Sequence, residues 1–448
     1  MAAVIEPPAD LEAQADHPSR KIGAITAAGV VVANIIGTGV FTSLGFQIGA
    51  IHSGFALLLL WVIGGIVALC GALCYGELSA ALPRSGGEYH FLSAIYHPAL
   101  GFAAGFVSAT VGFAAPIALA AMALAKYLEG IIGVHAPLLI SFAVVWLVGA
   151  VHLAGLRPGA AFQNAATAAK IALIGVLLAA GFLLPQIQPV RFTPASEDLF
   201  VMLGPGCAVA LVYVMYSYSG WNAAAYITDE IRSPEKNVPR SLVCGTLVVI
   251  LLYVSLNAVF LAAAPSSELA GQLEVGLIAG KHIFGEQGGR VVGAIICLGL
   301  VSSISSMTWI GPRVTMAMGE DHWLLRFLGR KNRQLVPVNA IAAQLLVVSL
   351  LLLTKSFELV VIYIQFSLLL CSLLTVIGVI VLRVRRPDLS RRYRVWAYPL
   401  PPIVFSFITL WMMVYLLYSH PIESLCGFGT MVAGLGVYFC SDRSRQRR

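Results

Sequence analysis

Twelve long apolar stretches constrain this chain more than any other feature of its sequence. A helix that crosses the hydrocarbon core of a bilayer needs about 20 predominantly apolar residues. Because helices satisfy their own backbone hydrogen bonds within lipid, we expect an all-α membrane protein with twelve transmembrane helices. The stretches lie at about 22–47, 54–80, 88–127, 136–154, 162–184, 202–231, 239–263, 290–318, 335–354, 357–382, 399–419 and 422–440.

Composition excludes the soluble classes of protein. Hydrophobic residues make up 59% of the chain and charged residues only 11%, whereas soluble domains are about 25% charged. Such a chain cannot cover a water-facing surface, so a soluble enzyme, a disordered chain and a nucleic-acid binder are excluded. None of the eight cysteines forms a CxxC pair, and we expect buried thiols without disulfides, metal or cofactor.

The basic residues predict the orientation in the membrane. With both termini cytoplasmic, 22 of the 28 Lys and Arg residues fall on the inner side and one, Lys170, lies within a span. Cytoplasmic loops carry the excess of basic residues, so we expect a multi-pass protein of the cell (inner) membrane. The five that fall outside are Lys126, Arg191, Lys281, Arg290 and Lys355.

The flanking and connecting segments complete the expected organisation. Residues 1–20 are polar and acidic, unlike a cleavable signal, and read as a cytoplasmic tail, as do residues 442–448. A transmembrane domain fills residues 21–441. Between its seventh and eighth spans, residues 264–289 form a glycine-rich loop in which a short helix around 273–284 is expected.

Two of the spans carry interruptions near their midpoints. The first reads Asn34-Ile35-Ile36-Gly37-Thr38-Gly39, and the sixth reads Tyr216-Ser217-Tyr218-Ser219-Gly220-Trp221-Asn222. Each glycine weakens a helix by about 1 kcal/mol, although glycines also serve close helix packing in lipid. Interruptions at corresponding positions of two halves point to an inverted-repeat transporter with a binding site at the membrane midplane.

Broken helices in lipid expose backbone groups that need partners. A half-helix that starts near Thr38 presents free N–H groups and the positive end of its dipole, which suit a carboxylate. Half-helices that end near Ile35 and Ser219 present free carbonyl groups, which suit an ammonium group. A molecule with both groups close together is an α-amino acid, so the breaks predict a substrate of that class.

Five segments together resemble the amino acid–polyamine–organocation transporters, and most closely the L-type amino acid transporter group with its bacterial homologues. Their order and spacing make the resemblance specific, and it extends from about Lys21 to Arg394. The segments are 34–41 with its Gly-Thr-Gly break, 75–89 with Pro83-Arg84-Ser85-Gly86-Gly87-Glu88-Tyr89, 216–240, Gly311-Pro312-Arg313 with 337–340, and 382–399.

The resemblance implies a fold of two five-helix inverted repeats, 21–184 and 202–382, with accessory helices in 399–440. It implies that Thr38 and Gly39 receive the substrate carboxylate and that the carbonyl groups of Ile35, Tyr216 and Ser219 receive its amino group. Tyr216 would also be an aromatic lid, and Asn222 would tie the sixth span to its neighbours. The expected substrate-binding residues are Ile35, Ile36, Gly37, Thr38, Gly39, Tyr216, Ser219, Gly220 and Asn222.

Lys170 is the ionisable residue within a span and therefore a candidate functional residue. The resemblance places it against the broken first helix, where sodium lies in sodium-coupled relatives, with carbonyl groups near Gly37 as its partners. Hydroxyl groups of Ser302, Ser303, Ser305 and Ser306 are further expected partners. A lysine that extends toward the membrane interface is the structural alternative.

The leading hypothesis is a sodium-independent secondary transporter that exchanges small neutral amino acids by alternating access. One alternative is a proton-coupled symporter that uses Lys170 as the proton carrier. A polyamine carrier ranks lower, since no acidic residue lies mid-span. A membrane enzyme would need clusters of His, Asp or Glu within the membrane, and a receptor would need a sensory domain; the sequence shows neither. A channel is disfavoured because paired helix breaks indicate a binding site.

Two further expectations concern specificity and partners. Ser219 replaces a glycine of some relatives and should narrow the pocket toward alanine or serine. The loop 129–137 lacks the cysteine through which animal relatives join a glycoprotein, so no disulfide-linked accessory subunit is expected.

Glu77 and Glu88 should either pair with Arg84 or distant basic residues, or lie in a solvated loop.

Overall fold

The computed structural model describes residues 22–154, 160–183, 188, 190–332 and 336–446, and within these ranges the chain is helical apart from turns, connections and one isolated β-bridge. The first half contains α1 (Ala24–Ile35), α2 (Gly39–Ile48), α3 (Gly54–Ala81), α4 (Glu88–Ile95), α5 (Pro98–Val107), a π-helical turn (Ser108–Gly112), α6 (Ala114–Ile132), α7 (Pro137–Leu153) and α8 (Ala160–Leu183).

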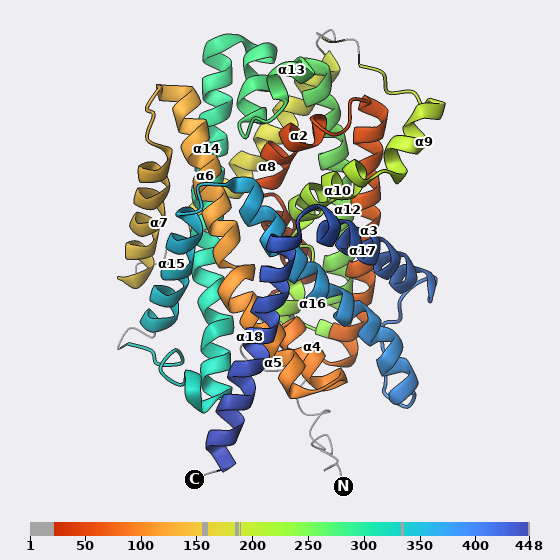
Figure 1. Cartoon of the computed structure of the whole chain (residues 1–448), viewed down its shortest axis with the longest axis vertical. Helices are drawn as coiled ribbons and strands as arrows, with labels where there is room; N and C mark the ends of the chain where they lie inside the picture. Colours follow the sequence, from red (N-terminus) through yellow and green to blue (C-terminus); the bar gives the residue numbers. More distant parts are fainter. Residues whose placement is uncertain (1–21, 155–159, 184–187, 189, 333–335, 447–448) are drawn as a thin grey trace.

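The second half begins with α9 (Ser196–Leu203) and continues along the same bundle (Figure 1). It contains α10 (Pro205–Tyr218), α11 (Ala223–Tyr226), a 3-10 turn (Thr228–Glu230), α12 (Pro234–Ala263), α13 (Ser266–Leu269), α14 (Val275–Asp321), a second 3-10 turn (Trp323–Leu325), α15 (Val338–Leu352), α16 (Phe357–Arg385), α17 (Leu400–Ser419) and α18 (Pro421–Gln446).

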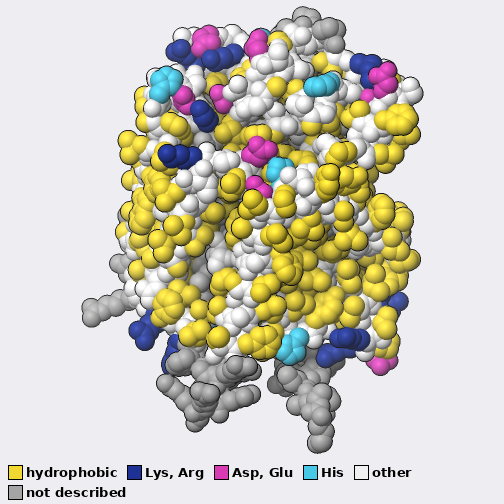
Figure 2. All heavy atoms as spheres, viewed as in Figure 1, with side chains coloured by type: hydrophobic (Ala, Val, Ile, Leu, Met, Phe, Trp, Pro, Cys, Tyr) yellow, Lys and Arg dark blue, Asp and Glu magenta, His cyan; other side chains and the backbone are white. Residues whose placement is uncertain are grey.

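The helices are those of a multi-pass membrane protein. Among the described residues, eight helices are long and apolar enough to cross a bilayer, and up to ten spans result if the bent pairs α1–α2 and α9–α10 each count once. Two shorter apolar helices, α7 and α15, coincide with two further predicted stretches. Hydrophobic side chains cover the middle of the visible face, while charged ones gather toward its two ends (Figure 2).

The third predicted span is wrong at its start. The stretch 88–127 is not one tilted helix, because α4 ends at Ile95 and a new helix begins at Pro98. His97 caps this new helix by accepting a hydrogen bond from Ala99 N at 3.1 Å. The helix α4 then packs against α5, where a side chain at Gly101 would overlap Ser93.

The predicted short helix before the eighth span is confirmed. It corresponds to the first part of α14, up to Gly285, whose φ of 73° interrupts the helix. Beyond this kink α14 continues alongside α6, which it contacts extensively (Figure 1). The loop 264–289 thus contains both α13 and the start of α14.

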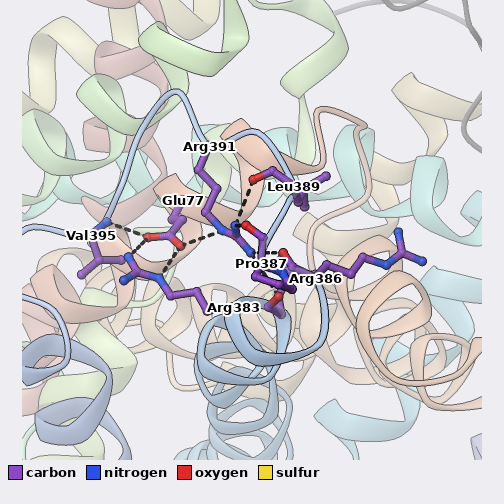
Figure 3. Close-up of polar contacts among 8 residues, drawn as sticks. Glu77, Arg383, Arg386, Pro387, Leu389, Arg391 and Val395 are labelled. Atoms are coloured by element: carbon purple, nitrogen blue, oxygen red, sulfur yellow. Dashed lines mark hydrogen bonds and ion pairs between the residues drawn. The ribbon is translucent and has the colours of Figure 1, made fainter.

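Buried Glu77 joins α3 to the end of α16 (Figure 3). Its side chain is 1% exposed and accepts hydrogen bonds from Arg383 Nε at 2.8 Å, Arg383 Nη2 at 2.5 Å and Val395 N at 2.7 Å. Arg391 Nε lies 3.5 Å from the same carboxylate. The Arg391 guanidinium also donates to the carbonyl groups of Leu382, Arg386, Leu389 and Pro387. The distant-partner alternative for Glu77 is therefore the one observed.

A short backbone pairing attaches the start of α1 to the end of the sixth span. Ile22 N donates to Glu230 O at 3.1 Å, and Arg232 N donates to Ile22 O at 2.9 Å. These two bonds form the β-bridge between Ile22 and Ile231. Two segments separated by about half the chain length are thereby connected through their main chains.

We expect Glu77→Gln to lower the free energy of unfolding, because two guanidinium groups lose their buried anionic partner. Breaking a buried ion pair typically costs about 3–5 kcal/mol. The matched control is Arg392→Gln, which removes a pair with Glu235 whose arginine is 68% exposed and should matter by less than about 1 kcal/mol. Thermal unfolding in detergent is the measurement, and equal shifts for both variants would contradict the assignment.

Candidate functional site

The first span breaks where its Gly-Thr-Gly sequence predicts. Helix α1 ends at Ile35, α2 begins at Gly39, and their axes differ by 40°. Thr38 precedes α2 without a side-chain capping bond. Like any helix start, that of α2 leaves its first N–H groups without partners inside the helix.

The sixth span breaks after Tyr218, also within the predicted segment. Gly220 has a φ of 100°, which favours glycine because it lacks a Cβ atom. The turn that contains it runs from Ser219 to Asn222 and leads into the four-residue helix α11. A separate bend of 73° lies between α9 and α10, at Gly204–Pro205, near the N-terminal end of the span.

The two breaks contact each other through glycines. A Cβ atom at Gly220 would lie 3.0 Å from Asn34 O, and one at Gly39 would lie 2.4 Å from Ser217 Cα. Any side chain at either position would therefore push the two spans apart. The missing side chains bring the interrupted backbones of residues 34–39 and 217–222 together.

A cavity of about 200 Å³ lies at these breaks and extends between α8, α14 and α16. Eight of the nine predicted substrate-binding residues line it, and Ile36 contributes its carbonyl group nearby. Those that line it are Ile35, Gly37, Thr38, Gly39, Tyr216, Ser219, Gly220 and Asn222.

Aromatic rings from α2, α10 and α16 pack against one another next to Tyr216, which lines the cavity. Phe46 stacks on Tyr213 at 5.0 Å and on Phe357 at 5.7 Å between ring centroids. Tyr216 meets Phe357 edge-on at 6.1 Å and interacts with the Thr38 side chain through its hydroxyl group. Residues of α1, α11 and the π-helical turn also line the cavity.

Lys170 reaches the first break from α8. Its side chain is buried, and Nζ donates to Ile36 O at 2.9 Å and lies 3.5 Å from Ser303 Oγ. Ser302, Ser303 and Ser306 line the cavity, whereas Ser305 points to His152 Nε2 at 3.1 Å. The ammonium group is thus turned into the protein, next to the unwound segment.

Other carbonyl groups at the breaks already have partners. Ile35 O accepts hydrogen bonds from Tyr253 Oη at 2.6 Å and from Gly37 N at 2.7 Å. Tyr216 O accepts one bond, from Ser219 N at 3.0 Å. Sequence reasoning missed Tyr253, since a tyrosine within the apolar seventh span gives no sign of the direction it faces.

The reading of Glu88 as a loop residue or an ion-pair partner is wrong. Glu88 is 4% exposed, lines the cavity, and accepts hydrogen bonds from the neutral groups of Tyr75, Asn222 and Tyr226. It belongs to the short helix α4, which folds back onto α5 and thereby comes close to the sixth span. The cavity therefore has an acidic residue in its wall, although none lies in the middle of a predicted span.

The charged groups of the cavity are consequently few. Among the described residues that line it, Lys170 and Glu88 carry charge, and the others are apolar, small or neutral polar. The described part of the chain contains no group of three or more His, Cys, Asp or Glu residues that could hold a metal ion. The arrangement therefore offers backbone dipoles and two opposite charges to a small polar solute.

Comparisons with known proteins identify the family of the chain. Residues 22–437 match the family described as amino acid permease. The chain is 27% identical to Asc-type amino acid transporter 1 of Mus musculus over 433 residues, which cover 93% of this chain and 80% of the relative.

Two human relatives are similar over as much of the chain. Large neutral amino acids transporter small subunit 2 is 26% identical over 436 residues, covering 94% of this chain and 80% of the relative. The b(0,+)-type amino acid transporter 1 is 25% identical over 431 residues, covering 94% and 87%. With the match over residues 22–437, the chain belongs to the amino acid permease family, whose members are transporters rather than enzymes.

Proposed function

We propose that this protein is a secondary transporter of α-amino acids that works by alternating access. The observation that carries the proposal is the pair of facing helix breaks around one cavity, with Lys170 bound to the carbonyl group of Ile36. The N–H groups at the start of α2 and carbonyl groups that can accept a further bond, all in one small volume, match the two charged ends of an α-amino acid. The names of the three relatives, all amino acid transporters, agree with this substrate class.

The substrate carboxylate binds at the start of α2. The N–H groups at Thr38 and Gly39 and the positive end of the ten-residue helix favour an anion there. The Thr38 hydroxyl group adds a donor once it exchanges Tyr216 for the substrate. Gly37 and Ile36 complete the unwound segment and leave room for the ligand to approach the backbone.

The substrate ammonium group binds the carbonyl groups of the sixth span. Ile35 O already accepts two bonds, and a carbonyl oxygen has two lone pairs. The main acceptors are therefore Tyr216 and Ser219, with Ile35 available only if Tyr253 or Gly37 releases it. Gly220 and Asn222 hold the turn that presents the Ser219 carbonyl group next to that of Tyr216 in α10, and the Tyr216 ring covers the bound substrate.

The proposed topology has twelve transmembrane helices in two five-helix inverted repeats, 21–184 and 202–382, and accessory helices in 399–440. Both termini are cytoplasmic, in the cell membrane. The two bent pairs and the short apolar helices α7 and α15 support this count. The stack of Phe46, Tyr213 and Phe357 then closes the outer side, so the cavity belongs to a state directed toward the cytoplasm.

Lys170 acts as a fixed cation in place of sodium, and the protein exchanges one amino acid for another. Its bond to Ile36 O supports this role, because the ammonium group satisfies a carbonyl group freed by the break. The second candidate is proton symport with Lys170 as the carrier. It is favoured by the burial of the amine, which opposes the charged form.

The substrates are small and neutral, such as alanine and serine. A cavity of about 200 Å³ is smaller than the about 300–1,000 Å³ of pockets for drug-sized ligands, and Ser219 narrows it. A polyamine carrier still ranks below these candidates. The acidic residue in the cavity wall, Glu88, already accepts three hydrogen bonds from the protein and is therefore not free to bind an amine. The protein works without a disulfide-linked accessory subunit, since loop 129–137 lacks a cysteine.

We expect Lys170→Ala to reduce alanine transport at least about a hundredfold, because the carbonyl group of Ile36 loses its partner within the membrane. The measurement is uptake of labelled alanine into proteoliposomes, normalised to folded protein. Lys355→Ala removes an exposed lysine far along the chain and serves as the control. Near-normal uptake by Lys170→Ala would show that the lysine has no coupling role.

Gly39→Ala should weaken alanine binding by about tenfold or more, because the added Cβ atom would lie 2.4 Å from Ser217 Cα and displace α2. Gly29→Ala is the matched control, since no atom lies within 4 Å of its Cβ position. Labelled alanine binding to the purified variants measures the effect. Wild-type affinity in Gly39→Ala would contradict a site at this break.

Exchange and symport are distinguished in proteoliposomes of defined contents. Exchange predicts uptake that requires internal amino acid, is unchanged by sodium and moves no proton. Proton symport predicts uptake into empty vesicles that follows an imposed pH gradient, recorded with an internal pH dye. Dependence on sodium would exclude both mechanisms, and a bulky or cationic best competitor would exclude the small neutral class.

A further inference from the structure

Glu88 is a buried acid that the proposed function leaves without a role. It is the first residue of α4 and is 4% exposed. Oε1 accepts hydrogen bonds from Tyr75 Oη at 2.8 Å and Asn222 Nδ2 at 3.0 Å, while Oε2 accepts one from Tyr226 Oη. Three neutral donors and the N-terminal end of α4 therefore surround this one carboxylate.

Two of the three donors lie at the two ends of α11. Asn222 is the residue before the helix and Tyr226 is its last residue. Four residues are too few for a stable helix on their own. Asn222 makes no side-chain capping bond to α11, although asparagine is a favoured cap, and its amide group instead donates to Glu88. One carboxylate thus holds both ends of this helix.

A second observation concerns the packing of Tyr226 on the residue before Glu88. A Cβ atom at Gly87 would lie 2.6 Å from the Tyr226 ring. Gly87 also has a φ of 53°, in the left-handed region. The Tyr226 ring consequently packs on the backbone of Gly87, while its hydroxyl group donates to the carboxylate of the next residue, Glu88. The sequence Gly87-Glu88 therefore receives the end of α11 by both packing and hydrogen bonding.

We propose that Glu88 is a positioning residue for substrate binding: by holding both ends of α11, it fixes the turn Ser219–Asn222, in which the Ser219 carbonyl group receives the substrate ammonium. The effect on substrate binding rests on the proposed function, whereas the contacts between Glu88 and α11 do not depend on it. A carboxylate is required because its two oxygens accept up to four bonds, whereas the amide of glutamine has a single acceptor atom.

The direct test is Glu88→Gln, with Glu77→Gln as the matched control. Both glutamates are buried, at 4% and 1% exposure, but Glu77 lies in the arginine cluster at the end of α16. We expect Glu88→Gln to weaken alanine binding to the purified protein by about tenfold or more, in the range of a lost bond to a charged group. Glu77→Gln should lower the unfolding temperature and leave the affinity unchanged.

A double-mutant cycle separates positioning from general destabilisation. Tyr226→Phe alone should weaken binding, whereas adding Tyr226→Phe to Glu88→Gln should weaken it little further, because both changes remove the same contact. Fully additive losses, or wild-type affinity in Glu88→Gln, would overturn the proposal. If Glu88→Gln does not fold, Tyr226→Phe carries the test, and its wild-type affinity would overturn the proposal equally.

Hydrogen exchange distinguishes this inference from the proposed function. Without any ligand, residues 219–226 should exchange faster in Glu88→Gln than in wild type, while Glu77→Gln should leave them unchanged. Unaltered exchange there would exclude the positioning role whatever the substrate. A wild-type protein that binds no member of a full amino acid panel, yet shows the faster exchange in Glu88→Gln, would overturn the proposed function alone.

Discussion

The need to satisfy backbone groups freed at two breaks within apolar spans governs this structure. In hydrocarbon each unpaired N–H or carbonyl group costs several kcal/mol. The chain supplies partners from distant helices, with Tyr253 of α12 on Ile35 O and Lys170 of α8 on Ile36 O. These contacts leave the start of α2 and the turn after α10 as the places where a solute can supply what the protein does not.

Two buried glutamates show how the surroundings of a carboxylate assign it to a task. Glu77 faces two guanidinium groups and a backbone amide, which is a fixed electrostatic junction between α3 and α16. Glu88 faces two phenols and an amide, all neutral, at the wall of the cavity. The first arrangement suits a part that stays in place, and the second a part that must keep its shape next to a changing ligand.

The amino-acid sequence predicted the helices and both breaks well, because these features are local. Gly37-Thr38-Gly39 and Ser219-Gly220 mark the interruptions to within a residue or two. The break before Pro98 was missed, although a proline directly after His97 is a helix-start signal. The roles of Tyr253 and Glu88 were not predictable, since an apolar helix gives no periodic sign of which face meets the cavity. The folding back of α4 depends on contacts far along the chain.

The backbone pairing between Ile22 and Ile231 has a mechanical consequence. Because it ties the entry of the first span to the exit of the sixth, neither half-helix can swing outward alone without tearing two main-chain bonds. The start of α1 and the end of the sixth span therefore move together. In the proposed alternating-access cycle, any rearrangement on that side therefore involves both spans at once.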